Sequence, residues 1–359
     1  MLFALVVFCL ILIYFVVEGY QQKKNVNSIP IRILVNGTRG KSTIVRLLVS
    51  ALNNSGFRTV GRSTGSEAQI LLPDGSIEPI IRKRSARIYE LIKFFKRAKE
   101  EKAECVVVEC MALQKENQIA VRDKLVIPTD VIICNTLVDH VPEMGSDVIS
   151  TSQVLGCSIP KDANVFVTEP YYDDKGKKVY HITLPEFGDT KTAVHPVAIA
   201  ICKAVLEEKD LGEEALEKAI ATFVPDIGLK SEALVGNSSV FVPTFSVNDL
   251  TMMEKTILKY KAFYPDKKLF VVFNSRADRE YRIILFKDIL TRQSDNIIKV
   301  YCIGDYNKKV ARAFSKLARS EAIGIEELGA LINDSKDSVF IGIGNIKGDG
   351  EKLLSKVGL

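Results

Sequence analysis

One glycine-rich run of this sequence carries the residue types that bind a nucleotide. It lies between an apolar run at residues 31–35 and apolar residues at helical spacing from 44 to 49, and it comprises Gly37, Thr38, Arg39, Gly40, Lys41, Ser42 and Thr43. Backbone N–H groups between a strand and a helix can surround a phosphate, helped by the positive end of the helix. Lys41 would contact the β- and γ-phosphates, and the Ser42 hydroxyl would bind Mg²⁺. The run therefore predicts a short P-loop for ATP and Mg²⁺; the alternative is a glycine-rich turn with a surface lysine.

Polar residues also follow two apolar runs that are typical of buried parallel strands. Glu109 ends the run at residues 105–109, and Asn135 ends the run at residues 130–135, with Asp139 and His140 shortly after it. Because the carboxyl ends of parallel strands meet at one edge of an open α/β sheet, we expect these groups to join the P-loop there. Taken singly, Glu109 could be a helix cap or an ion-pair partner, and His140 an ordinary loop histidine.

The chain begins with an apolar run that predicts a membrane segment. Residues 1–17 are apolar throughout, Glu18 ends the run, and Lys23 and Lys24 follow. Its length is at the lower limit for a bilayer-spanning helix. We therefore predict a transmembrane segment over residues 1–18 and a linker over residues 19–30. The lysines place the rest of the chain in the cytoplasm. A cleaved signal peptide or a buried N-terminal helix would be the alternatives.

The remaining sequence alternates strand and helix patterns in two blocks. The pattern breaks at residues 223–228, which include Pro225 and Gly228. We predict an α/β fold with a P-loop domain on a doubly wound, mostly parallel sheet over residues 31–224. A second, smaller Rossmann-like α/β domain would follow over residues 225–359. Polar residues again follow the predicted strands of this second block, namely Asn248, Asp249, Arg276, Asp278, Arg279 and Asn345.

Composition argues against several other classes of protein. Among 359 residues, 49 are Lys or Arg and 44 are Asp or Glu, and the basic residues are spread out without interleaved aromatic residues. We therefore expect no nucleic-acid binding. Seven cysteines without a C-x-x-C pair indicate a reducing compartment. Only three histidines are present, which argues against a multi-histidine metal site.

A short basic group precedes a predicted helix that begins near Ile88. It consists of Arg82, Lys83, Arg84 and Arg87. One interpretation is a solvated helix entry. The other is a docking site for an acidic polymer or for anionic lipid headgroups.

Together these motifs resemble the Mur ligase superfamily, whose members are ATP-dependent, ADP-forming amide ligases. Within it, the sequence is similar over nearly its whole length to the ligase subunits of capsule-type poly-γ-glutamate synthases. Besides the membrane segment and the P-loop, the matching segments are Thr64-Gly65, Glu109–Ala112, Asn135–Gly145, Asn248-Asp249, Asn274–Arg279 and Gly342–Gly348.

The resemblance implies a role for each matched residue. The nucleotide would be held by the P-loop residues and, from the second domain, by Asn248 and Asp249. Ser42 would bind one magnesium ion, and Glu109 with His140 a second one near the acceptor carboxylate. The implied catalytic residues are Lys41, His140 and Arg276. Possible substrate or cleft residues are Thr64, Asn135, Asp278, Arg279 and Asn345. The role of Lys230, near the place of a common Mur ligase arginine, stays open.

The same resemblance implies an enzyme that adds glutamate to a growing poly-γ-glutamate chain through an acyl phosphate at a terminal carboxylate. Its implied partners are small polytopic membrane subunits that complete the synthase and export the polymer. One alternative is a folylpolyglutamate synthase-like ligase, against which the membrane segment argues. Another is a membrane-associated P-loop ATPase that drives assembly or transport, although such an ATPase would have an aspartate in place of Glu109. A degenerate scaffold would be expected to have lost Lys41 or Ser42.

Overall fold

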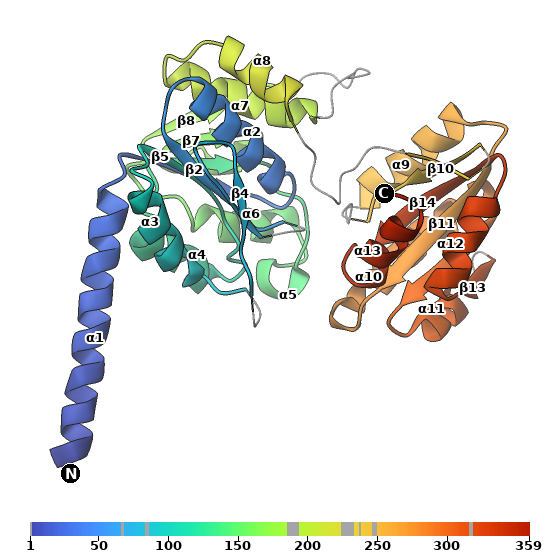
Figure 1. Ribbon diagram of the computed structural model, residues 1–359, viewed down its shortest axis with the longest axis horizontal. Helices are drawn as coiled ribbons and strands as arrows, with labels where there is room; N and C mark the ends of the chain where they lie inside the picture. Colours follow the sequence, from blue (N-terminus) through green and yellow to red (C-terminus); the bar gives the residue numbers. More distant parts are fainter. Residues whose placement is uncertain are drawn as a thin grey trace. The chain divides into compact units, whose positions relative to one another are not determined.

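The structure is a computed structural model that describes residues 2–65, 68–82, 86–184, 194–223, 233–236, 238–245, 250–315 and 319–359. The chain forms two compact units, Met1–Val224 and Pro225–Leu359. Each unit contains its own β-sheet with helices packed on it (Figure 1).

Unit 1 is built on an eight-stranded sheet in the order β4-β3-β2-β5-β1-β6-β7-β8. From β2 to β8 in this order, all neighbouring strands pair in parallel, whereas β3 is antiparallel to β2 and to β4. The predicted mostly parallel sheet is therefore confirmed. The strands are β1 (Ile31–Asn36), β2 (Thr59–Ser63), β3 (Gln69–Leu71), β4 (Ile77–Pro79), β5 (Cys105–Glu109), β6 (Asp130–Ile133), β7 (Asn164–Val167) and β8 (Lys178–His181).

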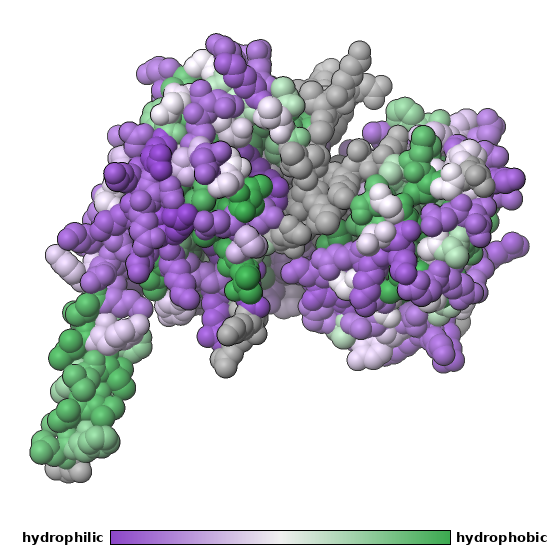
Figure 2. All heavy atoms as spheres, in the orientation of Figure 1, coloured by the Kyte–Doolittle hydropathy of each residue, from purple (hydrophilic) through white to green (hydrophobic). Residues whose placement is uncertain are grey.

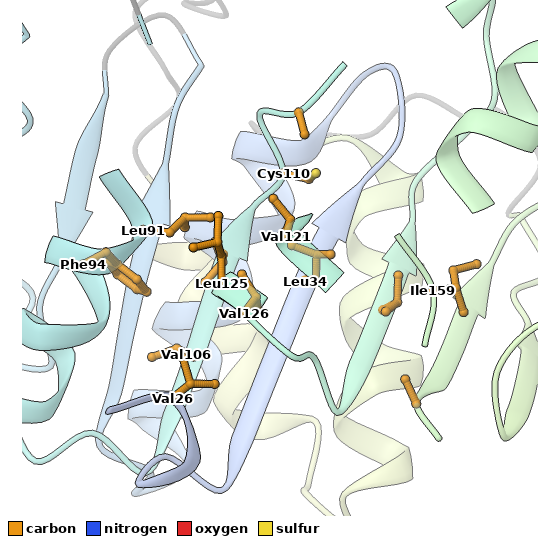
Figure 3. Close-up of a cluster of buried hydrophobic side chains, with 14 of the residues drawn as sticks. Val26, Leu34, Leu91, Phe94, Val106, Cys110, Val121, Leu125, Val126 and Ile159 are labelled. Carbon is orange, nitrogen blue, oxygen red and sulfur yellow. The ribbon is translucent and has the colours of Figure 1, made fainter. Parts of the chain in front are cut away.

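Helices cover both faces of this sheet, as a doubly wound fold requires. Successive side chains of β1 point to opposite faces of the sheet. Leu34 belongs to one buried cluster, whereas Ile33 and Val35 belong to the other, so both faces are covered. Figure 3 shows the first cluster, to which α1, α3 and the segment after α4 contribute. The second cluster is covered by α2, α7 and α8. The helices are α1 (Leu2–Asn27), α2 (Lys41–Asn54), α3 (Glu90–Glu100), α4 (Lys115–Ala120), the π-helical turn η1 (Val121–Leu125), α5 (Val141–Met144), α6 (Val148–Gly156), the 3-10 turn η2 (Pro170–Tyr172), α7 (Pro196–Glu208) and α8 (Glu214–Ala221).

Unit 2 repeats this plan on a six-stranded sheet in the order β13-β12-β11-β14-β10-β9. Only β9 is antiparallel to its neighbour among these described strands. Two buried clusters cover the two faces, one with α9 and α10, the other with α12 and α13. The elements are β9 (Ala233–Val235), β10 (Ser239–Val242), α9 (Leu250–Phe263), β11 (Lys268–Ser275), the 3-10 turn η4 (Ala277–Arg279), α10 (Tyr281–Arg292), the 3-10 turn η5 (Ser294–Asn296), β12 (Lys299–Gly304), α11 (Asn307–Phe314), β13 (Ser320–Ala322), α12 (Ile325–Asp334), β14 (Ser338–Gly344) and α13 (Asp349–Lys356).

Two parts of the chain differ from the sequence prediction. Strand β2 continues through Arg62 and Ser63, although polar residues do not indicate a buried strand, and both residues are fully buried. A charged residue rarely lies inside a buried strand, and here an ion pair with Glu90 makes it possible. The sequence also predicts no element where β13 and α12 lie. Helix α12 begins after Gly324, which gives no side-chain cap, and it contains a glycine, so its local signal is weak.

Helix α1 is longer than the predicted membrane segment. It runs to Asn27, so residues 19–27 are helical, and the predicted linker is wrong for them. Its last turns pack on unit 1, where Val26 is buried and the Gln22 side chain donates to the Leu125 carbonyl at 3.0 Å. Its most apolar 18-residue window has a mean hydropathy of 2.7 and is 0% buried, which suits a membrane span. Figure 1 shows α1 extending away from the rest of unit 1, and Figure 2 shows its hydrophobic surface.

A first prediction concerns this attachment of α1. Val26→Ala removes two methyl groups from a fully buried site, and we expect it to lower the free energy of unfolding of unit 1 by about 1–3 kcal/mol. Urea unfolding of the full chain in detergent micelles would measure the change. Val16→Ala, at an exposed position of the same helix, is the matched control. Equal stability of the two variants would show that α1 does not pack on the sheet.

Candidate functional site

The P-loop joins β1 to α2 at the carboxyl edge of the unit 1 sheet. Its backbone approaches the end of β6 so closely that a Cβ on Gly37 would lie 3.0 Å from the Asn135 carbonyl oxygen and from the Cys134 nitrogen. Gly37 and Gly40 have φ angles of 118° and 81°, in the left-handed region that favours glycine. Gly40 precedes α2 and provides no side-chain cap, so N–H groups of the first turn are available to a ligand. The backbone conformation therefore favours glycine at both positions of the motif.

Glu109, at the end of β5, connects the P-loop to the end of β2. Its Oε2 atom accepts hydrogen bonds from Ser42 Oγ at 2.9 Å, Ser63 Oγ at 3.2 Å and the Thr64 backbone nitrogen at 2.6 Å. The side chain is only 5% exposed, and hydrogen bonds of this kind offset the cost of burying a carboxylate. The structure therefore brings Ser42, Thr64 and Glu109 together at one point, and the strand pattern of the sequence predicts that Glu109 lies beside the P-loop.

Asn135 holds the other side of the P-loop. Its side-chain oxygen accepts from the Arg39 nitrogen at 3.0 Å, and its side-chain nitrogen donates to the Arg39 carbonyl at 3.0 Å. The Arg39 guanidinium forms an ion pair with Asp139 at 2.7 Å. Asp139 also accepts from the His140 backbone nitrogen at 2.9 Å, and the His140 ring lies 3.8 Å from the same carboxyl group. The Asp139–His140 segment is thus fixed beside the P-loop, with the His140 side chain 30% exposed.

The Lys41 side chain folds back onto the P-loop and contacts its backbone. Its Nζ atom donates to the Gly37 carbonyl at 2.7 Å and to the Thr38 carbonyl at 3.3 Å. The side chain is partly exposed, and its ammonium group stays at the mouth of the loop. A phosphate bound to the loop would be within reach of this cation after a small side-chain movement.

The donor set fits a nucleotide with a divalent cation. Ser42 and Glu109 present oxygen atoms beside the first turn of α2, and oxygen is the ligand that Mg²⁺ prefers. Among the described residues, no three His, Cys, Asp or Glu side chains form a group that could hold a metal ion. Mg²⁺ commonly has few protein ligands and completes its shell with water and substrate phosphates. The site is therefore suited to a metal that arrives with a nucleotide rather than to a permanent all-protein metal centre.

Two cysteines border the site without being nucleophiles. Burial raises the pKa of the Cys110 thiol to about 11 and that of the Cys134 thiol to about 12. Both groups are therefore protonated at neutral pH, and thiolate catalysis at these positions is excluded.

In unit 2, the sequence-predicted residues gather at the carboxyl ends of β11 and β14. Arg276 forms an ion pair with Asp278 at 2.8 Å, and Arg279 ends the same turn, η4. Asn345 is only 4% exposed, and its side chain donates to the Asn274 carbonyl and accepts from Arg282. It therefore joins two strand ends instead of facing solvent. Asn248, Asp249 and Lys230 lie outside the described residues.

Sequence reasoning missed two buried residues of the site. Asn36, the last residue of β1, accepts from the Gly37 nitrogen at 2.8 Å and donates to Gln118 and to Ser158. It positions the start of the P-loop, and its place directly before Gly37 was the available signal. Arg62 forms an ion pair with Glu90 at 2.6 Å next to the Glu109 strand end. No local pattern indicated it, because its partner lies 28 residues away.

Comparison with curated proteins finds relatives over nearly the whole chain. The chain is 27% identical over 382 residues to the PGA synthase CapB of Bacillus subtilis (strain 168), covering 98% of this chain and 97% of that protein. It is also 27% identical over 380 residues to the capsule biosynthesis protein CapB of Bacillus anthracis, covering 97% of this chain and 80% of that protein.

Solved structures with the same fold bind nucleotides. Escherichia coli FolC in complex with ADP superposes with a TM-score of 0.72 at 14% identity, covering 93% of this chain and 91% of FolC. The bifunctional folylpolyglutamate synthase/dihydrofolate synthase of Yersinia pestis, complexed with AMPPNP and Mn ion, gives 0.71 at 15% identity, covering 95% and 92%. MurF of Acinetobacter baumannii gives 0.66 at 13% identity, covering 95% and 78%.

A family model described as the poly-γ-glutamate synthase CapB C-terminal domain matches residues 231–358. The chain is therefore similar to the CapB proteins over nearly its whole length, and its fold is that of the folylpolyglutamate synthase and MurF structures.

Proposed function

We propose that this chain is a membrane-tethered, ATP-dependent and ADP-forming amide ligase that extends poly-γ-glutamate. The observation that carries the proposal is the similarity to two CapB proteins over 97–98% of the chain. The hydrogen-bonded group of Ser42, Thr64 and Glu109 beside the P-loop supports an enzyme rather than a scaffold. The nucleotide and manganese complexes of two proteins with the same fold support ATP and a divalent cation, for which we propose Mg²⁺.

The residues of the P-loop would bind and orient the triphosphate. Backbone N–H groups from Gly37 to Thr43 surround the β- and γ-phosphates at the start of α2. Lys41 releases its contacts with the Gly37 and Thr38 carbonyls and turns to the γ-phosphate. Ser42 would hold one Mg²⁺ ion, which when bound neutralises phosphate charge. His140, with Glu109, would serve a second Mg²⁺ near the acceptor carboxylate.

The chemistry requires that two anions meet. An oxygen of the acceptor carboxylate attacks the γ-phosphorus of ATP, the bond to the β-phosphate oxygen breaks, and ADP leaves with that electron pair. The amine of the incoming glutamate, after losing a proton, then attacks the carbonyl carbon of the acyl phosphate. Phosphate leaves and an amide bond remains. Lys41 at the mouth of the P-loop stabilises the charge that builds during phosphoryl transfer. Acyl phosphates hydrolyse readily, so the site must also exclude water.

Unit 2 would supply the remaining contacts. We assign Asn248 and Asp249 to the ribose and adenine of the nucleotide, and Arg276 to catalysis. Asp278, Arg279 and Asn345 are candidate substrate residues. In the described part of unit 2, Arg276 and Asp278 form an ion pair with 30% and 58% of their side chains exposed, so their groups are accessible to a ligand. The boundary between a central and a C-terminal ligase domain would fall near Val224.

The apolar helix α1 would anchor the enzyme in the membrane, with unit 2 and the rest of unit 1 in the cytoplasm where ATP is present. Lys23 and Lys24, on the C-terminal side of the apolar stretch, favour this orientation. Small polytopic membrane subunits would complete the synthase and export the polymer.

The function is tested with membranes that contain the full chain and its neighbouring membrane subunits. ATP, Mg²⁺ and radiolabelled D- or L-glutamate are supplied, and ADP release and label in polymer are followed together. We expect both products only when both substrates are present. ATP hydrolysis that is independent of any amino acid in a panel, without polymer, would instead identify the chain as an ATPase.

Lys41→Ala removes the cation at the mouth of the P-loop. We expect the rate of ADP release to fall by on the order of 10²–10³-fold with the fold intact, because the side chain is not part of the core. Thermal unfolding reports on the fold, and Lys93→Ala, at an exposed position of α3, is the matched control. Loss of folded protein in Lys41→Ala alone would identify Lys41 as a structural residue.

His140→Ala tests the assignment of a metal-binding role. We expect a higher Mg²⁺ concentration for half-maximal activity, since one metal ligand is lost. His181→Ala is the matched control, because His181 is exposed on β8 and pairs with Asp173. An unchanged Mg²⁺ titration in His140→Ala would remove this residue from the metal site.

A further inference from the structure

Arg62 is a buried arginine with unused hydrogen-bond donors. Its side chain has 0% exposure, and its Nη2 atom contacts Glu90 Oε2 at 2.6 Å and the Met111 sulfur at 3.2 Å. Its Nε and Nη1 atoms are buried and have no hydrogen-bond partner in the described part of the chain. A purely structural arginine is expected to satisfy its donors, because each unsatisfied buried group is destabilising.

The Glu90 carboxylate is shared between two arginines. Arg82 also binds Glu90, through contacts of 2.8 and 2.9 Å, so two guanidinium groups share one carboxylate. Burial lowers the pKa of Arg62, while Glu90 and, more weakly, Glu109 favour its charged form. An additional anion near Arg62 would therefore be stabilised by both charge and hydrogen bonding.

A cavity of about 530 Å³ lies next to this arginine, within unit 1. Its wall includes Arg87 and Tyr89 before α3, Met111 and Leu113 after β5, and Glu143 of α5. Met111 follows Glu109 by two residues, and the Glu143 nitrogen donates to the His140 carbonyl at 2.9 Å. The cavity thus borders both segments that carry the candidate metal-binding residues. Its volume suits a small organic ligand.

Met111 is the contact between Arg62 and this cavity. It lines the cavity and at the same time contacts Arg62 through its sulfur. Methionine is unbranched and changes rotamer easily, so the Met111 side chain can turn away from Arg62. Glu143 brings a negative charge to the same cavity, which suits the ammonium group of an amino acid.

We propose that this cavity binds a glutamyl group of the substrate and that Arg62 receives its carboxylate when the Met111 side chain turns aside. This inference rests on the proposed function and deepens it, because it identifies where an acidic substrate enters beside Glu109. The same chemistry is offered by free glutamate and by the end of a γ-linked glutamate chain. Part of the basic group before α3 would then serve the acidic polymer, through Arg82 and Arg87.

The test compares substrate KM values in membranes that contain the full chain and its membrane subunits. Arg62→Lys keeps the charge but loses the planar donors, and Ala86→Trp fills the cavity from an exposed position on its wall. We expect each variant to raise KM for one acidic substrate by roughly 10- to 100-fold, with KM for ATP changed less than about twofold. A raised KM for a γ-linked glutamate trimer identifies the polymer end as the ligand, and a raised KM for glutamate identifies the free amino acid.

The matched control is Arg32→Lys, at a partly buried arginine of β1 that donates to backbone carbonyls at the amino edge of the sheet. We expect Arg32→Lys to change the free energy of unfolding but to leave KM for the acidic substrates and KM for ATP unchanged. Unchanged KM values in Ala86→Trp and in folded Arg62→Lys would overturn the inference, leaving the proposed ligase function intact. If Arg62→Lys does not fold, Ala86→Trp decides alone.

A failure of the proposed function is recognised separately, because wild-type membranes would then form no polymer. In that case, equilibrium binding of the γ-linked trimer and of radiolabelled glutamate to the purified full chain in detergent decides the inference. The inference is supported if Ala86→Trp weakens the binding of the trimer or of glutamate by at least about tenfold. It is overturned if Ala86→Trp weakens the binding of neither ligand to that extent.

Discussion

The site depends on the hydrogen bonds that the buried carboxylate of Glu109 accepts. It lies at the end of a central strand and is only 5% exposed, yet it accepts hydrogen bonds from the P-loop helix and from the end of β2. A buried carboxylate without donors would be strongly destabilising, so these contacts require β1, β2 and β5 to end at the same level. The parallel registers of β1 with β5 and of β2 with β5 provide that alignment. The positions of Ser42 and Thr64 follow from it.

On the other side of the P-loop, the backbone passes so close to the end of β6 that only glycine fits. Gly37 leaves no room for a Cβ against the end of β6, and Asn135 binds both polar backbone groups of Arg39. The buried side-chain amide of Asn36 also accepts a hydrogen bond from the Gly37 nitrogen, at the start of the loop. The loop is therefore fixed by fold contacts before any ligand arrives. This preorganisation suits phosphate binding, because little loop ordering remains to oppose it.

Sequence patterns predicted the central strands, the doubly wound sheets and the residues that follow the strand ends. These features depend on local periodicity and on the rule that parallel strands share a carboxyl edge. The contributions of Arg62 and Glu90 depend on partners 28 residues apart, which no local pattern reveals. Asn36 stands directly before Gly37, but its contacts with Gln118 and Ser158, 82 and 122 residues away, have no local signal. A charge usually ends a buried strand, so the type of residue 62 gives no sign that Arg62 lies inside β2. The extension of α1 was missed for a similar reason, since its last turns are stabilised by packing on unit 1 and not by their polar sequence.

The attachment of α1 determines how the site can be reached. Val26 packs beside the start of the strands, and Gln22 binds Leu125 shortly before β6 begins, so both contacts lie at the amino edge of the sheet. Glu109 and the P-loop lie at the carboxyl edge. Figure 3 shows this separation, with Val26 and Cys110 at opposite ends of one cluster. Strands of this length separate the two edges by roughly 17–20 Å. Because α1 and the site occupy opposite edges, the proposed substrates would enter unit 1 without displacing the helix that would hold it in the membrane.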